Sequence, residues 1–420
     1  MIFFFTKQTY TITDKVIGMT QPSVLQAPAI DTGCRIVAEE AIYISSNRQY
    51  LRLRDQFKQG KSPLRRVKKS LIKKIMTKEQ APVNLATNQS FKELLLALGP
   101  IHKSNGKVLF INGLSAGFGD SLMGMTAYRI FYKELSKCYP GLKIDFAQSR
   151  KDLMGSIYNH SDGINDRIQL PIKLEKFFEY DAYFDLSIFL KMSDFDNEHF
   201  VDAYLKIFML NPNNYSNSVK RNKIRTSDTI NKEVKGILNT INQKRKLLLF
   251  HPKASCAIRS IPKSYQSFFL DKIIKETDYT VVSLQENNYK DPRFVDLSSM
   301  CTSFDHLISF IQNVDVLACV DTCLYHIADC FNIPSIAIFS SIAPELRIKY
   351  YPTVKGMMLS KEKCQLGLHK SADPSLIIDF AKEWTNFNYN QFISELNLLY
   401  ESPQHQLIYN DKGSPYEIFL

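Results

Sequence analysis

Long hydrophobic runs are missing from this 420-residue sequence. No stretch approaches the roughly 18 consecutive apolar residues that a transmembrane helix requires, so no membrane-spanning helix is predicted. The opening segment contains an apolar cluster of only four residues (IFFF), and no small-residue cleavage site follows it. A secretory signal peptide is therefore not expected. No internal repeat or low-complexity tract stands out.

Cysteines are few, and none has the spacing of a small disulfide-bonded domain. The eight cysteines are scattered singly along the chain, at positions 34, 138, 256, 301, 319, 323, 330 and 364. This distribution favours a reducing, cytoplasmic setting. Hydrophobic residues make up 45% of the chain and charged residues 23%, which is typical of a globular protein. At roughly 150 residues per domain, the length predicts two or three domains.

The excess of positive charge is confined to one segment. Lys and Arg outnumber Asp and Glu by 53 to 42, and eleven of these basic residues lie between Arg52 and Lys78 with a single acid, Asp55. Apolar residues recur there at helical spacing: Leu64, Val67, Leu71 and Ile75. Three hypotheses follow: a solvated helix packed by its apolar stripe, a surface that meets an anionic membrane, or a nucleic-acid site. Sparse aromatic residues disfavour the third.

The chain divides into a basic extension and two series of alternating strands and helices. Residues 1–104 are predicted to form a mainly helical extension, with short helices over 26–42, 47–58 and 64–76. Strands are then predicted at KVLFING, KIDFAQ and DAYFDLSIF, with a long helix over 121–141 after the first. The second series contains strands at KLLLFHP, YTVVSL, VDVLACV and IPSIAIFSS and helices over 262–275, 304–313 and 321–332.

Strand, glycine turn and helix in series indicate parallel, doubly wound α/β sheets. We therefore predict two Rossmann-like domains, over residues 105–225 and 246–375. The segment 211–246 is polar, rich in Asn and Lys, and poor in apolar periodicity, so it is expected to contain the connection between them. Residues 376–420 are predicted to form closing helices.

The first candidate site is the glycine-rich turn NGLSAGFGD at 112–120. Gly117 and Gly119 allow the backbone to turn tightly and approach a ligand, and the following helix offers N–H groups to an anion. The spacing G-x3-G-x-G-D does not match the dinucleotide-binding fingerprint. Asp120 is either an ordinary N-terminal helix cap or a carboxylate at the ligand-binding carboxyl end of a sheet.

The second candidate site is the segment VDTCLYH at 320–326. A strand followed by Asp321 and Thr322, and then by a helix whose first turns carry His326, suits a diphosphate. The alternatives are two ordinary caps and a core histidine. Ser255 and Arg259 lie in another loop between a strand and a helix, where Arg259 either binds phosphate oxygens or is solvated.

No metal site is predicted. The spacing of Cys319, Cys323 and Cys330 around His326 fits no structural zinc pattern, and all lie in an apolar strand and helix. Buried cysteines are common in such positions. The acidic triplet at 194–196 (DFD) follows no clear strand and is interpreted as a chance occurrence.

In their order along the chain, these segments resemble glycosyltransferase family 9, the ADP-heptose:lipopolysaccharide heptosyltransferases, over about 107–352. The resemblance rests on G-x-G-D-S-L at 117–122 with Arg129 after it, on YDAYFDLS at 180–187, and on FDHLISFIQNVDVLACVDTCLYHIADCFNIPSIAIFSSIAPE at 304–345. In the last block the family shows a helix, a strand ending in V-D-T-G-L-x-H-x-A, a further strand and a phosphate-side loop. The resemblance implies a GT-B fold, in which two Rossmann-like domains face a cleft.

The resemblance also implies a role for each candidate residue. Asp120 matches the proposed catalytic base, and Gly117 and Gly119 lie in its acceptor-side loop. The residues implied at the donor site are Ser255, Arg259, Glu286, Asp321, Thr322, Cys323 and His326. Three departures border that site: Cys323 replaces a glycine, Tyr325 replaces a small residue, and Ile261 replaces the Trp of a K-x-W-P motif.

The predicted function is metal-independent, inverting transfer of a heptose-like sugar from a nucleotide-sugar, similar to ADP-heptose, to a hydroxyl of lipopolysaccharide or another glycan. No cofactor is required, and no nucleic acid is expected as a partner. The resemblance and the charge pattern imply a cytoplasmic location, peripheral on the inner face of the plasma membrane. Three alternatives remain: transfer to a protein acceptor, a non-catalytic GT-B protein that binds a glycan or nucleotide, and a nucleic-acid-binding protein.

The membrane hypothesis predicts salt-sensitive binding to anionic vesicles. Each Lys or Arg of segment 52–78 near such a surface contributes roughly 1 kcal/mol, and this attraction decays within a Debye length. Sedimentation should show the protein bound at low salt, released at high salt, and unbound after deletion of residues 1–80. A full-length protein that ignores anionic vesicles even at low salt would show that the segment is a solvated face or a protein contact.

Overall fold

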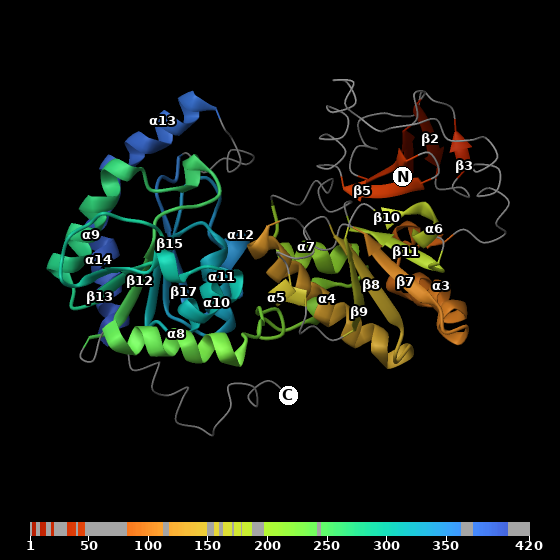
Figure 1. Ribbon diagram of the computed structural model, residues 1–420, viewed down its shortest axis with the longest axis horizontal. Helices are drawn as coiled ribbons and strands as arrows, with labels where there is room; N and C mark the ends of the chain where they lie inside the picture. Colours follow the sequence, from red (N-terminus) through yellow and green to blue (C-terminus); the bar gives the residue numbers. More distant parts are fainter. Residues whose placement is uncertain are drawn as a thin grey trace. The chain divides into compact units, whose positions relative to one another are not determined.

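The computed structural model contains two compact units (Figure 1). The first consists of Met1–Phe195 and Val201–Tyr215, and the second of Asp196–Phe200 and Ser216–Leu420. Side chains are described for most of the residues in the ranges 82–111, 117–148, 157–158, 163–169, 176–177, 179–186, 197–241, 245–362 and 373–401, and only the backbone for several short elements elsewhere. The basic segment 52–78 and the helices predicted over 47–58 and 64–76 lie outside the described residues.

The first unit is built on a parallel sheet of five strands, in the order β6-β11-β7-β8-β9. Their bounds are Val83–Asn84, Ala182–Asp185, Lys107–Ile111, Lys143–Gln148 and Ile164–Gln169, respectively. The strands predicted at KVLFING, KIDFAQ and DAYFDLSIF are confirmed. Because β7 is buried on both faces, it reads as a nearly continuous apolar run, whereas β8, which is also buried, includes Asp145 and Gln148.

The first unit also contains five described α-helices. They are α3 (Phe91–Lys103), α4 (Phe118–Cys138), α5 (Gly155–Tyr158), α6 (Leu174–Phe177) and α7 (Phe200–Ile207). The short strand β6 lies in the stretch that the sequence assigned to the N-terminal extension, and it pairs with β11 as part of this sheet.

An aromatic cluster fixes α4 on the sheet. The ring of Phe110 in β7 lies 5.2–6.1 Å, between centroids, from five other aromatic rings: Tyr128, Phe131, Phe146, Phe184 and Phe208. Two of these, Tyr128 and Phe131, belong to α4, which is buried along most of its length. Since β7 ends at Ile111 and α4 begins at Phe118, this packing places the start of α4 at the carboxyl edge of the sheet.

Strands occupy part of the N-terminal extension. They are β1 (Ile2–Phe5), β2 (Thr9–Thr13), β3 (Gly18–Thr20), β4 (Thr32–Ala38) and β5 (Ala41–Ser46). Strand β5 pairs antiparallel with β4 and with β10 (Ile172–Lys173). The helix predicted over 26–42 is therefore wrong, and the extension is not mainly helical where it is described. Ile, Val and Tyr recur in CRIVA and AIYIS, and such residues favour strands.

The second unit contains a parallel sheet of six strands, in the order β14-β13-β12-β15-β16-β17. Their bounds are Phe294–Asp296, Thr280–Ser283, Leu247–His251, Val316–Val320, Ser335–Phe339 and Val354–Met358. All four strands predicted for this series are confirmed. The chain runs outward in one direction from β12 and in the other from β15, so the topological switch point lies between these two strands.

Helices cover both faces of this sheet (Figure 1). They are α8 (Asp228–Ile241), α9 (Lys263–Glu276), α10 (Phe304–Gln312), α11 (Cys323–Cys330), α12 (Glu345–Ile348), α13 (Pro374–Glu383) and α14 (Tyr389–Glu401). The helices predicted over 262–275, 304–313 and 321–332 are confirmed. No helix of the described residues is long and apolar enough to cross a membrane.

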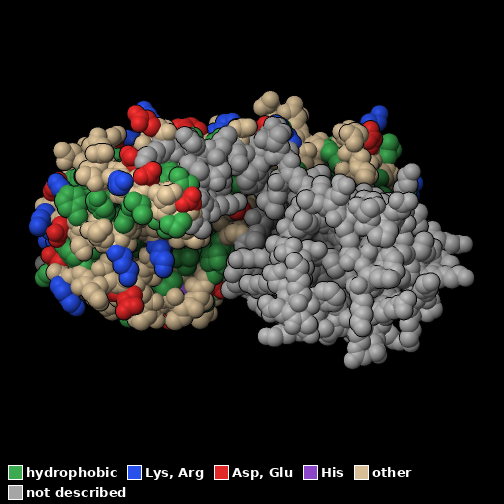
Figure 2. Space-filling model, turned by 90° about the horizontal axis from the view of Figure 1, so that it is seen from above, with side chains coloured by type: hydrophobic (Ala, Val, Ile, Leu, Met, Phe, Trp, Pro, Cys, Tyr) green, Lys and Arg blue, Asp and Glu red, His purple; other side chains and the backbone are tan. Residues whose placement is uncertain are grey.

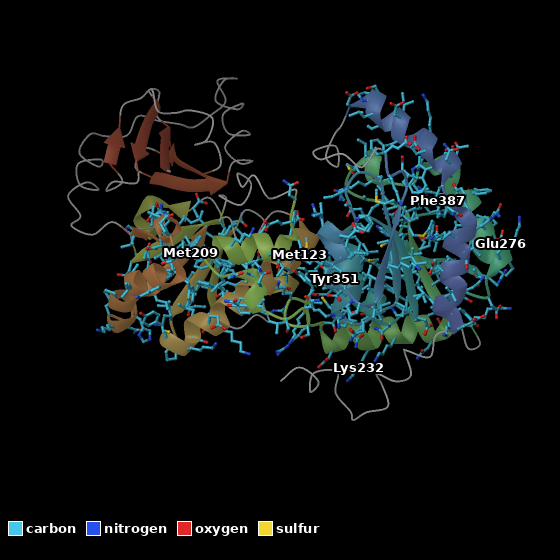
Figure 3. All side chains as sticks on the ribbon, turned by 180° about the vertical axis from the view of Figure 1, so that it is seen from behind. Met123, Met209, Lys232, Glu276, Tyr351 and Phe387 are labelled. Carbon is cyan, nitrogen blue, oxygen red and sulfur yellow. The ribbon has the colours of Figure 1, made fainter. Side chains whose placement is uncertain are left out.

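Helix α8 was not anticipated from the sequence. The chain passes from the first unit to the second after Tyr215, inside the polar segment 211–246, but α8 occupies the second half of that segment. Val234 and Leu238 are buried, while exposed Lys232 lies on the outer side of the helix (Figure 3). The apolar residues have the 3–4 spacing of an amphipathic helix, which the many Asn and Lys residues between them obscure.

Charged side chains of both signs are interspersed over the described part of the face shown in Figure 2. The described surface on this face therefore has no cluster of positive charge as dense as the one in the sequence at 52–78.

Candidate functional site

Asp321 lies at the switch point of the second unit, directly after β15. Its backbone N–H donates to the carbonyl of Ile338 in β16, at 2.9 Å. Its carboxylate accepts hydrogen bonds from Nη1 of Arg259 at 3.2 Å and from the hydroxyl of Tyr325 at 2.8 Å. The Asp321 side chain is only 7% exposed. Both oxygens of the carboxylate are thus held by protein groups.

Arg259 connects the loop after β12 to Asp321. Besides the carboxylate, Nη1 reaches the Asp321 carbonyl at 3.1 Å, Nη2 donates to Ser255 Oγ at 2.6 Å, and Nε donates to Cys256 Sγ at 3.3 Å. Burial opposes the charge of Arg259, but the neighbouring Asp321 outweighs it and raises the pKa of the guanidinium. Three predicted site residues, Ser255 and Arg259 from one loop and Asp321 from another, therefore meet, and Asp321 neutralises the Arg259 cation.

The start of α11 faces the same edge of the sheet. Thr322 is the N-cap residue, with extended backbone angles (φ −148°, ψ 173°), and its side chain caps no backbone N–H of the helix. Thr322 and Cys323 are both partly exposed. The first N–H groups of a helix have no intrahelical partner and attract anions. This turn can therefore hold a phosphate group.

His326 is a buried, neutral residue of α11. Its Nδ1 lies 2.7 Å from the hydroxyl oxygen of Tyr351. Burial lowers the pKa of His326 well below its usual value, and the positive charge of Arg347 and the neighbouring His199 and Arg259 lower it further. The imidazole is therefore uncharged at neutral pH. This burial fits the core histidine that the sequence left as one alternative, while a role of His326 in binding a ligand stays a prediction.

Arg347 is a cation that the sequence analysis missed. It lies on α12, beyond β16, and is 5% exposed. Its Nη1 donates to the carbonyl of Leu346 at 3.0 Å, and its guanidinium stacks over the ring of Phe200, 4.0 Å from the centroid. Among the described residues no carboxylate forms an ion pair with it. Because an unpaired buried charge is costly, this arrangement favours an anionic ligand nearby.

Two buried serines lie between β16 and α12. The hydroxyls of Ser340 and Ser341 have no hydrogen-bond partner among the described residues. A buried hydroxyl without a partner costs about 1–3 kcal/mol, which a ligand oxygen would offset. Glu286, by contrast, is exposed in the loop after β13, and no contact among the described residues joins it to Asp321.

In the first unit, Asp120 is the third residue of α4. The N-cap residue is Gly117, and a Cβ placed there would lie 3.0 Å from Asp120 Oδ2, so glycine leaves room for the carboxylate over the helix start. Burial raises the pKa of Tyr204, and the charge of Asp120 adds to this effect, so a neutral phenol lies near the carboxylate. Gly119 is buried beneath the turn.

Gln148 is a second residue that the sequence analysis missed. It ends β8 at the same edge, is 4% exposed, and its amide has no partner among the described residues. Alternation along the strand places it on the face of Phe146, whose ring lies 4.9 Å from Tyr128 of α4 and 5.7 Å from Tyr158 of α5. The Gln148 amide is therefore on the side of the sheet that α4 covers.

No three His, Cys, Asp or Glu residues of the described chain lie close enough together to hold a metal ion. Cys319 is completely buried, and burial raises its pKa well above the ordinary value. The DFD triplet at 194–196 lies outside the described residues.

Comparisons with known proteins agree with this architecture. Residues 186–374 match the family model for glycosyltransferase family 9 (heptosyltransferase). The solved ADP-heptose lipopolysaccharide heptosyltransferase II of E. coli has 16% identity and a TM-score of 0.50, over 71% of this chain and 99% of that one. This likeness shows the GT-B fold.

Two further solved structures give lower TM-scores. A family 9 glycosyltransferase of Veillonella parvula has 11% identity and a TM-score of 0.49, over 70% of this chain and 97% of that one. The iron-containing dodecameric glycosyltransferase TibC of enterotoxigenic E. coli has 11% identity and a TM-score of 0.46, over 72% of this chain and 80% of that one. Among curated proteins, no significant sequence match was found.

The neutral pair of Arg259 and Asp321 predicts a stability difference between two substitutions. Asp321→Asn leaves the largely buried Arg259 without its counter-charge and should lower the free energy of unfolding by about 3 kcal/mol. Asp278→Asn, which breaks the exposed pair with Arg245, should have little effect. Urea unfolding measures the free energy of unfolding of both variants. Equal decreases would show that the buried Arg259–Asp321 pair stabilises the fold no more than the exposed pair does.

Proposed function

We propose that this chain, of which residues 186–374 match the model for glycosyltransferase family 9, transfers a heptose-like sugar from a nucleotide-sugar to a glycan hydroxyl. The second unit binds the donor and the first unit binds the acceptor. The observation that carries this proposal is the polar group at the switch point of the second sheet. It consists of Asp321 paired with Arg259, the Thr322 N-cap of α11, whose side chain caps no backbone N–H, and Arg347, which has no ion-pair partner among the described residues.

The donor diphosphate is bound by Arg347, by the first N–H groups of α11 with Thr322, and by the hydroxyls of Ser340 and Ser341. Arg259 instead positions Asp321 and Ser255, because its guanidinium already makes four hydrogen bonds to oxygens and sulfur of the protein. These cationic and N–H groups are suited to the charge of a departing diphosphate, so the proposal includes no metal ion.

Transfer proceeds with inversion. The acceptor oxygen forms a bond to the anomeric carbon while the bond from that carbon to the diphosphate oxygen breaks on the opposite face. The hydroxyl proton passes to Asp120, and the electron pair of the broken bond stays on the diphosphate. The Gln148 amide is buried on the α4 side of its sheet and has no hydrogen-bond partner among the described residues, so in this proposal it binds another hydroxyl of the acceptor.

A lipid-linked glycan, as in lipopolysaccharide-type biosynthesis, is the acceptor we favour. Segment 52–78, with eleven basic residues and one acid, would concentrate the enzyme at an anionic membrane surface where such an acceptor lies. A cytoplasmic, peripheral location is part of the same proposal.

Asp120→Asn tests the base. The substitution should lower kcat by a factor of about 10²–10⁴ because an amide cannot accept the hydroxyl proton, while donor affinity stays unchanged. Folding should be preserved, since Asn is also compatible with the first turn of a helix. Steady-state kinetics and calorimetry measure the two effects, and turnover close to the wild-type value would reduce Asp120 to a helix-stabilising residue.

Arg347→Gln tests whether the Arg347 guanidinium binds the diphosphate of the nucleotide-sugar. Loss of a charge-assisted contact to phosphate should weaken nucleotide-sugar binding about 10–100-fold. The free energy of unfolding of the unliganded protein should stay the same or rise, because an unpaired buried charge is removed. Lys349→Gln, which removes an exposed cation two residues away, is the control and should leave the Kd unchanged. An unchanged Kd for Arg347→Gln would place the diphosphate elsewhere.

A further inference from the structure

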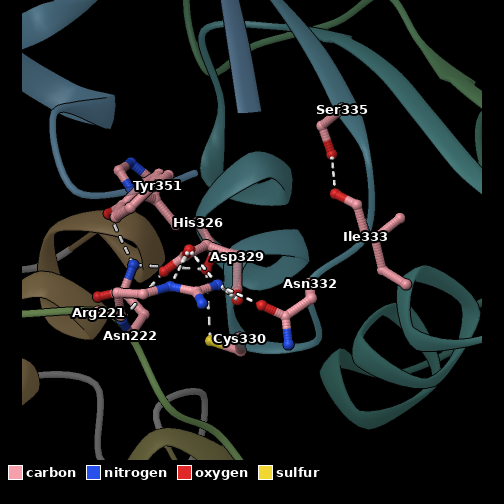
Figure 4. A network of polar contacts seen from close by, with 9 residues as sticks. All are labelled: Arg221, Asn222, His326, Asp329, Cys330, Asn332, Ile333, Ser335 and Tyr351. Carbon is pink, nitrogen blue, oxygen red and sulfur yellow. Dashed lines mark hydrogen bonds and ion pairs between the residues drawn. The ribbon is translucent and has the colours of Figure 1, made fainter. Parts of the chain in front are cut away.

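A polar network joins the first residues of the second unit to α11 (Figure 4). Arg221 donates through Nε and Nη2 to Asp329 Oδ1, at 3.0 and 2.8 Å. The other carboxylate oxygen of Asp329 accepts the backbone N–H of Asn222 at 3.0 Å. Asp329 is almost completely buried, so these bonds fix the Asn222 backbone against the helix that carries His326.

The orientation of the Asn222 amide follows from its two neighbours. Its Nδ2 lies 2.6 Å from the hydroxyl oxygen of Tyr351 and 3.4 Å from the backbone carbonyl oxygen of His326. A carbonyl oxygen can only accept, so the amide atom facing it is the nitrogen. Asn222 therefore donates to the Tyr351 oxygen, and the Tyr351 O–H is left to donate to another group.

That group is His326. The Tyr351 oxygen lies 2.7 Å from His326 Nδ1, so Nδ1 accepts the hydroxyl proton. A neutral imidazole that accepts at Nδ1 carries its own proton on Nε2. Burial and the positive charge of Arg347 keep the ring neutral, by lowering the pKa of His326. No described residue forms a hydrogen bond with Nε2.

We propose that Asn222 and Tyr351 are positioning residues that hold His326 as its Nε2–H tautomer, in which the ring donates a hydrogen bond to an oxygen of the donor diphosphate. The identity of this ligand rests on the proposed function, whereas the tautomer follows from the network alone. The opposite tautomer would present a lone pair to the phosphate oxygen, which repels it. The bond strengthens as the diphosphate gains charge, so it acts on turnover more than on acceptor binding.

Nitrogen NMR of protein labelled at histidine tests the tautomer directly. In the wild-type protein, His326, assigned by substitution, should show a protonated Nε2 and an unprotonated Nδ1. Tyr351→Phe keeps the buried ring but removes the hydroxyl, so both tautomers should appear, kcat should fall about tenfold, and the KM for acceptor should stay unchanged. Tyr350→Phe is the matched control, because the Tyr350 hydroxyl is also buried but accepts from Lys220 instead.

Two results would overturn the proposal. A protonated Nδ1 in the wild-type protein contradicts it even if no variant folds, and a single unchanged tautomer in folded Tyr351→Phe shows that the hydroxyl does not set it. Adding ADP, UDP or GDP separates this inference from the proposed function. If the Nε2–H tautomer is present but none of the three shifts the Nε2 signal, the network is correct and the donor assignment fails.

Discussion

The carboxylate of Asp321 is held between the guanidinium of Arg259 and the hydroxyl of Tyr325, and the charge balance at the edge of the second sheet depends on this arrangement. Because Arg259 is paired with Asp321, we propose that it orients its neighbours rather than binding an anion. A positive charge then remains on Arg347. Burial first, and this charge second, lower the pKa of His326 and keep its ring uncharged. A diphosphate would complete a site in which the hydroxyls of Ser340 and Ser341 have no hydrogen-bond partner among the described residues.

The two sheets place these groups by the same rule. In each unit, the polar residues of the candidate site lie at or beyond the carboxyl ends of buried parallel strands. Ligands of open α/β sheets bind at this edge. Asp321 follows β15 and Ser340 follows β16, while Gln148 ends β8 and Asp120 lies in the first turn of the helix after β7. The apolar interiors of these strands, buried on both faces, fix the polar ends in position.

The sequence predicted the strands that are buried on both faces, because these are mostly apolar. Ser255, Arg259 and Asp321, which the family resemblance assigned to one donor site, are in contact, while their role in binding a donor stays a prediction. The strands β4 and β5 were not predicted. Helix α8 was not predicted either, because polar residues separate the apolar residues that mark its buried face. Arg347 and Gln148 were also missed, because an unpaired buried group is a property of packing and leaves no motif. Tyr325, a departure from the family pattern, proves to hold Asp321 through its hydroxyl.

Hydrogen exchange of the intact protein, with and without a panel of ADP-, UDP-, GDP- and CMP-linked sugars, tests the central claim that the second unit binds a nucleotide-sugar at this edge. A ligand that binds the native state slows the opening of the segments it touches. We expect at least one nucleotide-sugar to slow hydrogen exchange of the backbone amides in both 321–327 and 340–347. Protection confined to other segments, or none with any nucleotide-sugar, would contradict it.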